Sequence, residues 1–516
     1  MKRNALYRFT TALGIIAVHL AISGAALAED IPRGGTLSIG RPEEPLTFDP
    51  FIPSDNGSIY AIAQVCEPLV RADKEGTGLE PGLAESWTIS EDGLTYIFAL
   101  RPGIMFSNGK KLTADDVIYS LNKLLDPAAA YNFAFAPVKS VEKIDESHIK
   151  VSLKTPYTPI LSALSLFSAS IVEKASYEAD KEAFGVKPMC TGAFMVDTYE
   201  RGSQVVLSPN PHYWGTGLDG KPLPYLDKVI LRYMPDGNSR VLGLQNGDLD
   251  AAISVPLNQA AALKTTDGIS LEVSPSYRLD YVYLNHDKKP MDDKRIRLAL
   301  NYATNHDALM KAVYFGYGEA PNSFMPKVNY WSSKVEKIPY DLDEATRLVK
   351  EANYDGTPIQ LMIDTGNSAS RQTASILQAA WTKIGLKVEI IEYDSGTSFS
   401  MTQKGDYQAY VSYITSDIND SDELATLQTD QGGATKSFFS NYKNDEVIKL
   451  LAQAREEKDD AKRAALYEKI QDTVYHDGYS VPLNFLPYVN GYSSKVKNWH
   501  NIAVGWWWLK DMWIAQ

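Results

Sequence analysis

The stretch "EDGLTYIFALRPGIMFSNGKKLTADDV", residues 91–117, carries a clear structural pattern and no reactive group. Apolar side chains recur at every second position from 94 to 100, which predicts a strand with one buried face. A Pro-Gly pair and an Asn-Gly pair then supply turn sequences. Thr113, with Asp116 three residues later, has the form of a capping box and predicts the start of a helix. The stretch therefore predicts scaffold structure rather than a reactive site, and it is useful for recognising the class of protein.

The rest of the chain mixes strand-like and helical segments, with no internal repeat that would indicate a solenoid or a propeller. Strands are predicted at residues 149–153, 204–207, 228–233 and 282–284, and helices at 296–313, 344–351, 369–384 and 445–474. The tryptophans at 506–508 and 513 suggest a final buried strand. This pattern predicts an α/β protein, and one domain per ~150 residues gives two or three lobes.

The N-terminus has the pattern of a secretory signal peptide over residues 1–28. A basic start is followed by an apolar run at 13–22 and by alanines at 26 and 28. The alternative is an uncleaved anchor, but a run of about 10 residues is far shorter than the ~20 that cross a bilayer. No cysteine follows the cleavage site, so no lipid anchor is predicted. We expect a mature protein free in the periplasm.

Charge and cysteine content narrow the class further. The net charge is −13, and loss of the three basic residues of the predicted signal peptide makes it −16. Such an acidic chain argues against nucleic-acid or anionic-membrane binding, and no other run reaches membrane-spanning length. Cys66 and Cys190 are the only cysteines. In an oxidising compartment they either pair or stay buried and inert.

No catalytic, metal-binding or cofactor motif is present. The histidines outside the signal peptide lack metal-ligand spacing, and the serine-hydrolase and P-loop motifs are absent. Gly316-Tyr317-Gly318 is only part of a dinucleotide fingerprint. The sequence therefore predicts no catalytic residue, no metal and no cofactor. Its 30 tyrosines and 9 tryptophans suit the binding of polar organic ligands, although most are expected in the core.

A longer stretch, "LEPGLAESWTISEDGLTYIFALRPGIMFSNGKKLTADDVIYSLNKLLDP" at residues 79–127, resembles the signature of the family 5 extracellular solute-binding proteins. This family supplies ABC importers with dipeptides, oligopeptides and nickel chelates. Cys66 and Cys190 replace a tyrosine and a glycine of the family, and this double departure favours a bond between them. Further matching landmarks include Cys-Glu-Pro-Leu at 66–69, Thr-Gly-Ala-Phe at 191–194, Asn-Pro-His-Tyr-Trp at 210–214 and Gly-Asp-Leu-Asp at 247–250.

The resemblance implies the fold of a type II-like periplasmic binding protein, with two lobes, a two-segment hinge and a small accessory domain. It implies a hinge near residues 274–285 and 481–488. The quoted stretch would lie in the accessory domain, so it marks the family and says little about the cargo. The implied boundaries are 29–72, 190–275 and 485–516 for lobe I, 73–189 for the accessory domain and 276–484 for lobe II.

In dipeptide-binding members, an aspartate pairs with the ligand's α-amino group, and an arginine 53 residues earlier holds its carboxylate. The matching segment here, "SYITSDINDSD", puts Asp417 at the amine position and Asp364 at the arginine position. An aspartate ~4 Å from a ligand carboxylate would repel it by about 1–4 kcal/mol, so a plain dipeptide should bind poorly. The alternative is that both aspartates are surface loop residues. Other candidate ligand-binding residues are Tyr413, Asn419, Asn367, Asp55, Asn56 and Tyr277.

We therefore predict a solute-binding receptor of an ABC importer that closes two lobes around a small polar organic solute. The solute is expected to be a peptide-like compound, an amino-acid/sugar conjugate or an oligosaccharide. The expected partners are the inner-membrane ABC permease and its ATPase, and the protein is expected to be a monomer that is not membrane-embedded. The alternative, a periplasmic hydrolase or peptidase, has no catalytic constellation to support it.

Overall fold

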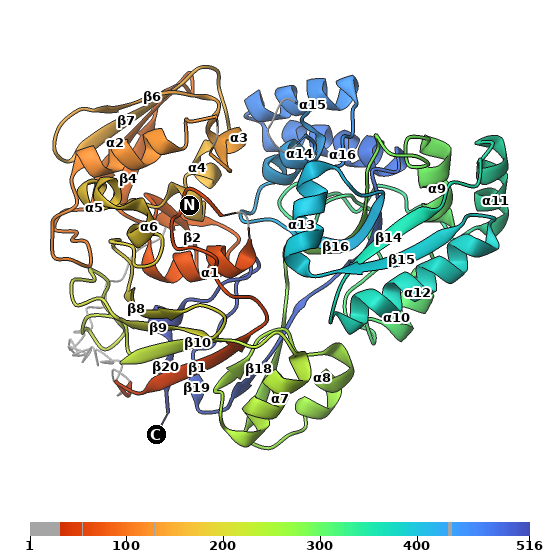
Figure 1. Cartoon of the computed structure of the whole chain (residues 1–516). Coiled ribbons are helices and arrows are strands. Elements are labelled where there is room, and N and C mark those ends of the chain that lie inside the picture. Colours follow the sequence, from red (N-terminus) through yellow and green to blue (C-terminus); the bar gives the residue numbers. More distant parts are fainter. Residues whose placement is uncertain (1–30, 54, 128, 432–435, 516) are drawn as a thin grey trace, which may run out of the picture.

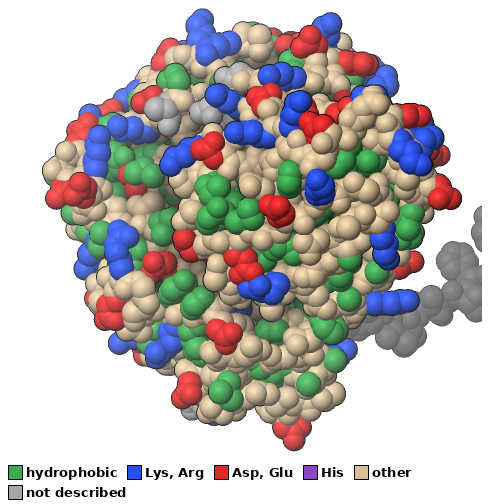
Figure 2. All heavy atoms as spheres, turned by 45° about the vertical axis from the view of Figure 1, so that its right-hand side comes forward, with side chains coloured by type: hydrophobic (Ala, Val, Ile, Leu, Met, Phe, Trp, Pro, Cys, Tyr) green, Lys and Arg blue, Asp and Glu red, His purple; other side chains and the backbone are tan. Residues whose placement is uncertain are grey.

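The computed structural model describes residues 31–53, 55–127, 129–431 and 436–515 (Figure 1). The predicted signal peptide lies outside these residues. No helix in the described part of the chain combines the length and the apolar character that crossing a membrane requires. On the face shown in Figure 2, acidic and basic side chains are interspersed, and neither sign gathers into one large patch.

The first sheet has seven strands, drawn from both ends and the middle of the chain. The short strand β11 lies between β18 and β1, and β1 runs parallel to both β10 and β11. Helices α7 (Gly237–Asn246) and α8 (Leu257–Leu263) pack on its β18 side, while α1 (Asn56–Val65) packs against β8 (Figure 1). In spatial order the strands are β12 (Ile269–Ser274), β18 (Tyr488–Ser493), β11 (Ala251–Ala252), β1 (Thr36–Arg41), β10 (Lys228–Tyr233), β9 (Gln204–Pro209) and β8 (Phe194–Glu200).

The second sheet has five strands, in the order β15 (Val388–Tyr393), β14 (Ile359–Asp364), β16 (Ala409–Thr415), β13 (Arg278–Leu284) and β17 (Ser480–Phe485). Its two faces are both covered, because alternate β13 residues belong to different apolar cores. One core holds Val282 and Trp381, and the other holds Tyr281 and Tyr467. The covering helices are α9 (Lys294–Tyr302), α10 (His306–Ala312), α11 (Leu342–Glu351), α12 (Ser368–Lys383), α13 (Ser395–Lys404), α14 (Ser421–Thr429), α15 (Asp445–Glu456) and α16 (Asp460–His476).

A third, antiparallel sheet contains the strand of the 91–117 stretch. Its order is β4 (Ala84–Ile89), β5 (Thr95–Leu100), β7 (His148–Leu153) and β6 (Val138–Lys143), and α2 (Ala114–Lys123) packs against it. The predicted capping box is confirmed, because the Thr113 side chain accepts from the Asp116 backbone and the Asp116 side chain accepts from the Thr113 backbone. The remaining elements nearby are α3 (Asn132–Phe135), α4 (Ile160–Ala163), α5 (Lys174–Ala179), α6 (Lys181–Phe184) and the hairpin of β2 (Val70–Ala72) with β3 (Leu79–Pro81).

Two secondary-structure predictions were too coarse, and a third was wrong in part. The predicted helix 445–474 is two helices, because the chain leaves the helical conformation at Glu457 and Asp459 caps a new one. The predicted helix 296–313 is likewise two, with Asn305 capping the second. The tryptophans at 506–508 form no regular strand and make a single bridge, Asn501 with Trp507, and only 513–514 enter a short strand, β20 (Trp513–Ile514), which pairs with β19 (Val496–Lys497).

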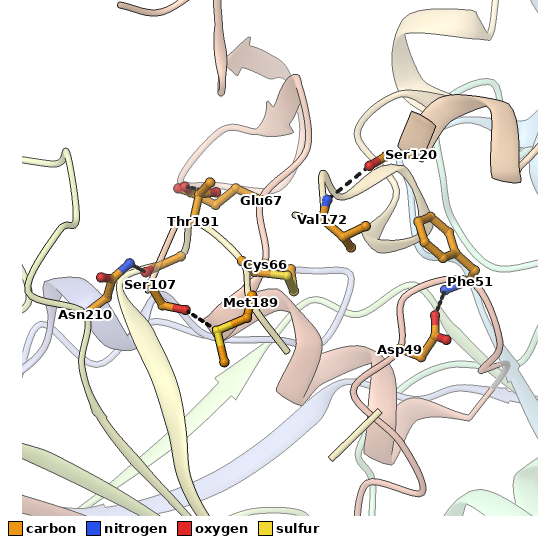
Figure 3. The surroundings of a disulfide bond; sticks show 12 residues. Asp49, Phe51, Cys66, Glu67, Ser107, Ser120, Val172, Met189, Thr191 and Asn210 are labelled. Atoms are coloured by element: carbon orange, nitrogen blue, oxygen red, sulfur yellow. Dashed lines mark hydrogen bonds between the residues drawn. A yellow bond between two sulfur atoms is a disulfide. The ribbon is translucent and has the colours of Figure 1, made fainter. Parts of the chain in front are cut away.

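Cys66 and Cys190 form a disulfide in the structure (Figure 3). Cys66 caps the C-terminal end of α1, and Cys190 lies just before β8. The bond therefore links the end of this helix to the start of an edge strand of the first sheet. Ser107 donates its backbone N–H to the Cys190 carbonyl at 2.8 Å and its hydroxyl to the Met189 sulfur at 3.6 Å. The backbone of Cys190 is therefore also hydrogen-bonded to residue 107 of the 91–117 stretch.

Two chain crossings join the first two sheets, one from β12 to β13 and one from β17 to β18. The Ser276 hydroxyl of one crossing donates to the Leu486 carbonyl of the other. Each of the three sheets takes its strands from the segments expected for one lobe or for the accessory domain, apart from Phe485 at a boundary. The domain limits and the hinge remain a proposal.

Candidate functional site

The site is built on one face of the second sheet. In the antiparallel pair of β13 and β16, Arg278 lies opposite Thr415, and Asp280 lies opposite Tyr413. Because side chains alternate along a strand and opposed residues share a face, these four point to the same side. The pairing of β13 with β16 therefore brings a cation, a carboxylate, a phenol and a hydroxyl to one face. The two strands are more than a hundred residues apart in the sequence.

Hydrogen bonds connect this face to the first sheet's side of the molecule. The Tyr413 hydroxyl donates to Glu43 Oε1 at 2.9 Å, and Asn56 Nδ2 donates to Thr415 Oγ1 at 3.3 Å. Asn56 is the first residue of α1, and Asp55 caps that helix by accepting from the Ser58 backbone at 2.8 Å. These direct bonds join the two sheets across their interface.

Asp417 is the central acid of the site. It lies two residues beyond the end of β16 and is 5% exposed. Tyr131, from the segment before α3, donates its hydroxyl to Asp417 Oδ2 at 2.6 Å. The other carboxylate oxygen, Oδ1, is buried without a hydrogen-bond partner among the described residues. Burial raises the pKa of Asp417 to about 6, against the lowering effect of the Tyr131 bond. This orphan acceptor is the clearest sign of a missing donor.

Glu423, on α14, holds the loop that presents Asp417. Its Oε2 accepts from the Ser416 hydroxyl at 2.6 Å and from the backbone N–H groups of Asp417 and Ile418 at 3.0 and 3.3 Å. Burial, with the nearby Asp417 charge, raises the pKa of Glu423 well above its usual value. The two buried carboxyl groups therefore carry one negative charge more readily than two.

Arg278 is the cation of the site. Its guanidinium carbon lies 3.9 Å from the centre of the Tyr413 ring, and its Nε donates to Asp280 Oδ1 at 2.7 Å. The hydroxyls of Tyr60 and Tyr488 lie 3.4 Å apart nearby, and the charges of both Arg278 and Asp417 act on Tyr488. Sequence reasoning missed Glu43, Tyr131, Arg278 and Glu423. Arg278 is brought to the site by strand pairing, and Glu43 and Tyr131 are brought there by contacts between segments distant in the sequence. Glu423 is only six residues beyond Asp417, but no sequence motif marks it.

The other predicted residues have structural partners. Asp364 ends β14, is half-buried and accepts from the Tyr410 hydroxyl at 2.9 Å on both oxygens. Asn367 is exposed and caps α12. Asn419 donates to the Thr77 carbonyl at 2.9 Å, and the buried Tyr277 donates to the Gly76 carbonyl at 3.2 Å. None of these four bonds directly to Asp417, and their contact with a ligand stays a prediction.

A metal site is not evident in the described part of the chain, where no group of three or more histidine, cysteine, aspartate or glutamate side chains is placed to hold an ion. The arrangement is suited to binding: a buried acid, a stacked guanidinium and several phenols facing one another between two sheets.

The comparisons with known proteins identify the class. The profile described as "Bacterial extracellular solute-binding proteins, family 5 Middle" matches residues 78–436. The glutathione-binding protein GsiB of Escherichia coli O157:H7 is 30% identical over 496 residues, with 94% of each chain covered. Heme-binding protein A of Haemophilus influenzae is 29% identical over 470 residues, with 85% of each chain covered. The periplasmic binding protein DppA from Helicobacter pylori, in complex with the peptide STSA, superposes with a TM-score of 0.87 at 28% identity, covering 94% of this chain and 99% of that one.

The fold is that of the type II periplasmic binding proteins, as predicted. Within that class, the chain belongs to family 5 of the bacterial extracellular solute-binding proteins. Members of this family bind solutes for ABC transporters and are not enzymes, so the prediction of a binding protein over a hydrolase is confirmed. The homologues are periplasmic binding proteins, and family 5 proteins deliver their solutes to an ABC permease and its ATPase.

Proposed function

We propose that this protein captures a small polar solute bearing a primary amine, by closing two lobes around it, and delivers it to an inner-membrane ABC permease. The observation that carries the proposal is Asp417, a buried carboxylate with one oxygen bonded to Tyr131 and the other without a partner. An ammonium supplies both the missing donor and the compensating charge, and such charge-assisted bonds are among the stronger ones in proteins. A peptide-like compound or an amino-acid/sugar conjugate meets this requirement, and an oligosaccharide would meet it through hydroxyl donors alone.

The relatives' ligands support an amine without fixing the cargo. GsiB is named for glutathione, and the DppA structure holds the peptide STSA. Both compounds carry a free ammonium. Heme, for which another relative is named, carries none. The buried acid in this chain favours the first kind of ligand.

Asp364 argues against a plain dipeptide, because it stands where the resemblance expects an arginine. A ligand carboxylate within ~4 Å of it would be repelled by about 1–4 kcal/mol. Asp364 is half-buried and accepts a hydrogen bond from the Tyr410 hydroxyl. It forms no ion pair with a described lysine, arginine or histidine. We expect a dipeptide to bind more weakly than a ligand whose carboxylate lies elsewhere.

Capture works through closure. A ligand that touches both walls stabilises the closed state by the difference between its affinities for the closed and open states. The direct bonds of Tyr413 to Glu43 and of Thr415 to Asn56 already join the walls, so the ligand adds to an existing interface. A micromolar dissociation constant needs about −8 kcal/mol, which a few charge-assisted bonds and aromatic contacts can supply.

Calorimetry on the purified protein tests the proposal. Glutathione, STSA, a simple dipeptide, heme and the N-acetylated forms of glutathione and STSA are titrated separately. We expect binding of at least one amine-bearing compound and its loss on N-acetylation. Asp417→Asn should weaken that compound by about tenfold or more. Equal binding of free and acetylated forms would refute the amine site, and tight heme binding alone would replace the proposed cargo.

We also propose that the protein is a monomer released by cleavage after Ala28, without a lipid anchor. N-terminal sequencing and the intact mass of protein from a periplasmic extract test the cleavage, and light scattering tests the mass in solution. An added lipid mass, or a dimer at micromolar concentration, would contradict this part.

A further inference from the structure

Arg278 has an unused binding edge in the candidate site. Its Nε donates to Asp280, but neither Nη1 nor Nη2 donates to any described residue. A guanidinium has five N–H donors and binds a carboxylate through two parallel bonds. Its side chain is 26% exposed although Tyr413 and Asp280 pack against it, so the guanidinium is not fully enclosed by the protein.

The free edge is held in a fixed orientation. The guanidinium lies over the Tyr413 ring at 3.9 Å, while Asp280 accepts from Nε at 2.7 Å and leaves the end of the fork free. Tyr413 is itself fixed by its bond to Glu43 on the opposite wall. A planar donor edge that is held in this way pays little conformational entropy when it binds a planar acceptor.

The backbone register places Asp417 near Arg278 in the sheet. Arg278 is opposite Thr415 in the sheet, and Asp417 follows Thr415 by two residues, which span at most about 7 Å. The charges of both Arg278 and Asp417 act on the Tyr488 hydroxyl, in opposite directions, while burial raises the pKa of Tyr488 to about 12. The cation and the acid therefore lie at the same edge of the second sheet.

We propose that Arg278 is the carboxylate-binding residue of this site and that the solute carries an α-amino-acid head, with its ammonium at Asp417 and its carboxylate on the same carbon at Arg278. This inference rests on the proposed function and narrows its ligand class. In an α-amino acid the amine nitrogen and the carboxylate carbon are about 2.5 Å apart, which suits a residue on β13 and another just beyond the end of its neighbour β16. The ends of an extended tetrapeptide are about 10 Å apart or more, which suits this pair poorly. Asp364 then no longer opposes binding, because the carboxylate is held away from it.

The test compares glutathione with analogues that differ from it only in the head group, and with the peptide STSA. Glutathione has an ammonium and a carboxylate on one carbon, and γ-aminobutyryl-cysteinylglycine lacks that carboxylate but keeps the amine and the rest. Affinities of both, of N-acetylglutathione and of the peptide STSA are measured by calorimetry. The proteins are the wild type, Arg278→Gln, Arg278→Lys and the control Arg347→Gln, which alters an exposed arginine of α11 that pairs only with Glu344 and Glu351 of its own helix.

We expect the wild type and Arg347→Gln to bind glutathione at least tenfold more tightly than the analogue without the head carboxylate. In Arg278→Gln this preference should vanish, with glutathione falling to the affinity of the analogue, and Arg278→Lys should keep part of it. A preference that survives in Arg278→Gln, or a wild type that binds STSA but not glutathione, overturns the inference and leaves the amine site standing. Undiminished binding of N-acetylglutathione, or no binding of any amine-bearing probe, overturns the proposed function and this inference together.

Discussion

At the scale of single residues, the buried acid pair makes the stability of the protein depend on pH. Burial raises the pKa of Asp417 to about 6, and burial together with Asp417 raises that of Glu423. Between the unfolded value near 4 and the folded value, the folded protein binds more protons, so its stability falls as pH rises through that window. Stability from this source is therefore greatest at acidic pH, which is the opposite of a salt-bridged aspartate.

The prediction is that urea unfolding of ligand-free wild type shows this loss between pH 4 and 6, while Asp417→Asn shows a smaller one. The free energy of unfolding is measured at several pH values for both proteins. An amine-bearing ligand needs ionised Asp417, so its affinity should rise over the same window. Identical pH profiles for wild type and variant would show that Asp417 does not titrate there.

Tyr131 should adjust this titration without being ionised itself. Its hydroxyl bond to Asp417 stabilises the charged carboxylate, so Tyr131→Phe should move the pH window upward. Removing the bond also leaves a buried acceptor unpaired, at a cost of about 1–3 kcal/mol. The measurement is the difference in unfolding profiles between variant and wild type.

Tyr157→Phe is the matched control for Tyr131→Phe. Tyr157 also reaches the second sheet's side of the molecule, donating to Asp422 Oδ2 at 2.7 Å, but it does not touch Asp417. Both variants should lose stability, and only Tyr131→Phe should shift the pH window. Equal shifts of the pH window in the two variants would show that the effect comes from general destabilisation and not from the bond to Asp417.

At the scale of elements, the disulfide should be a major contributor to stability. It joins cysteines 124 residues apart, and closing a loop of this length restricts the unfolded chain strongly. The double variant Cys66→Ala with Cys190→Ala should lose about 2–5 kcal/mol in urea unfolding. Reduction of the wild type should reproduce the loss, whereas reductant should leave the variant unchanged. Equal stability of wild type and double variant would show the bond to be dispensable.

Sequence patterns predicted a strand or a helix start correctly where neighbouring residues determine it. The alternating apolar residues of β5 and the Thr113–Asp116 box are set by neighbours in sequence, and both are found as expected. The division of 445–474 was missed because a short capped break at Asp459 interrupts an otherwise helical pattern. Asp417 could be picked out only through the family resemblance, because its residue type alone does not distinguish it. Arg278 gave no signal, because its neighbours Tyr413 and Thr415 come from a strand paired with it through the sheet.

At the scale of the whole molecule, we expect the bonds between the two sheets to influence the balance between the proposed closed and open forms. The landmarks of the family are also joined at this scale: Glu67 accepts from Thr191 at 3.0 Å and from Trp214 at 2.9 Å, so motifs far apart in sequence meet around one carboxylate. Such contacts join segments that are distant in the sequence on the first sheet's side of the molecule. Motion is then expected at the two crossings, where only two chain segments connect the sheets.

Tyr413→Phe tests this balance directly. It removes the hydroxyl bond to Glu43 across the interface and keeps the ring under Arg278. A bond to a charged group contributes about 1.5–3 kcal/mol, so the closed-to-open ratio of the ligand-free protein should fall by about tenfold or more. Small-angle scattering should show a larger radius of gyration for the variant than for the wild type. Tyr410→Phe is the control, because it removes a bond from the same strand to Asp364 within one lobe and should leave the radius unchanged. Saturating ligand should bring both variants back to the compact form, whereas a Tyr413→Phe protein as compact as the wild type without ligand would show that this bond does not govern closure.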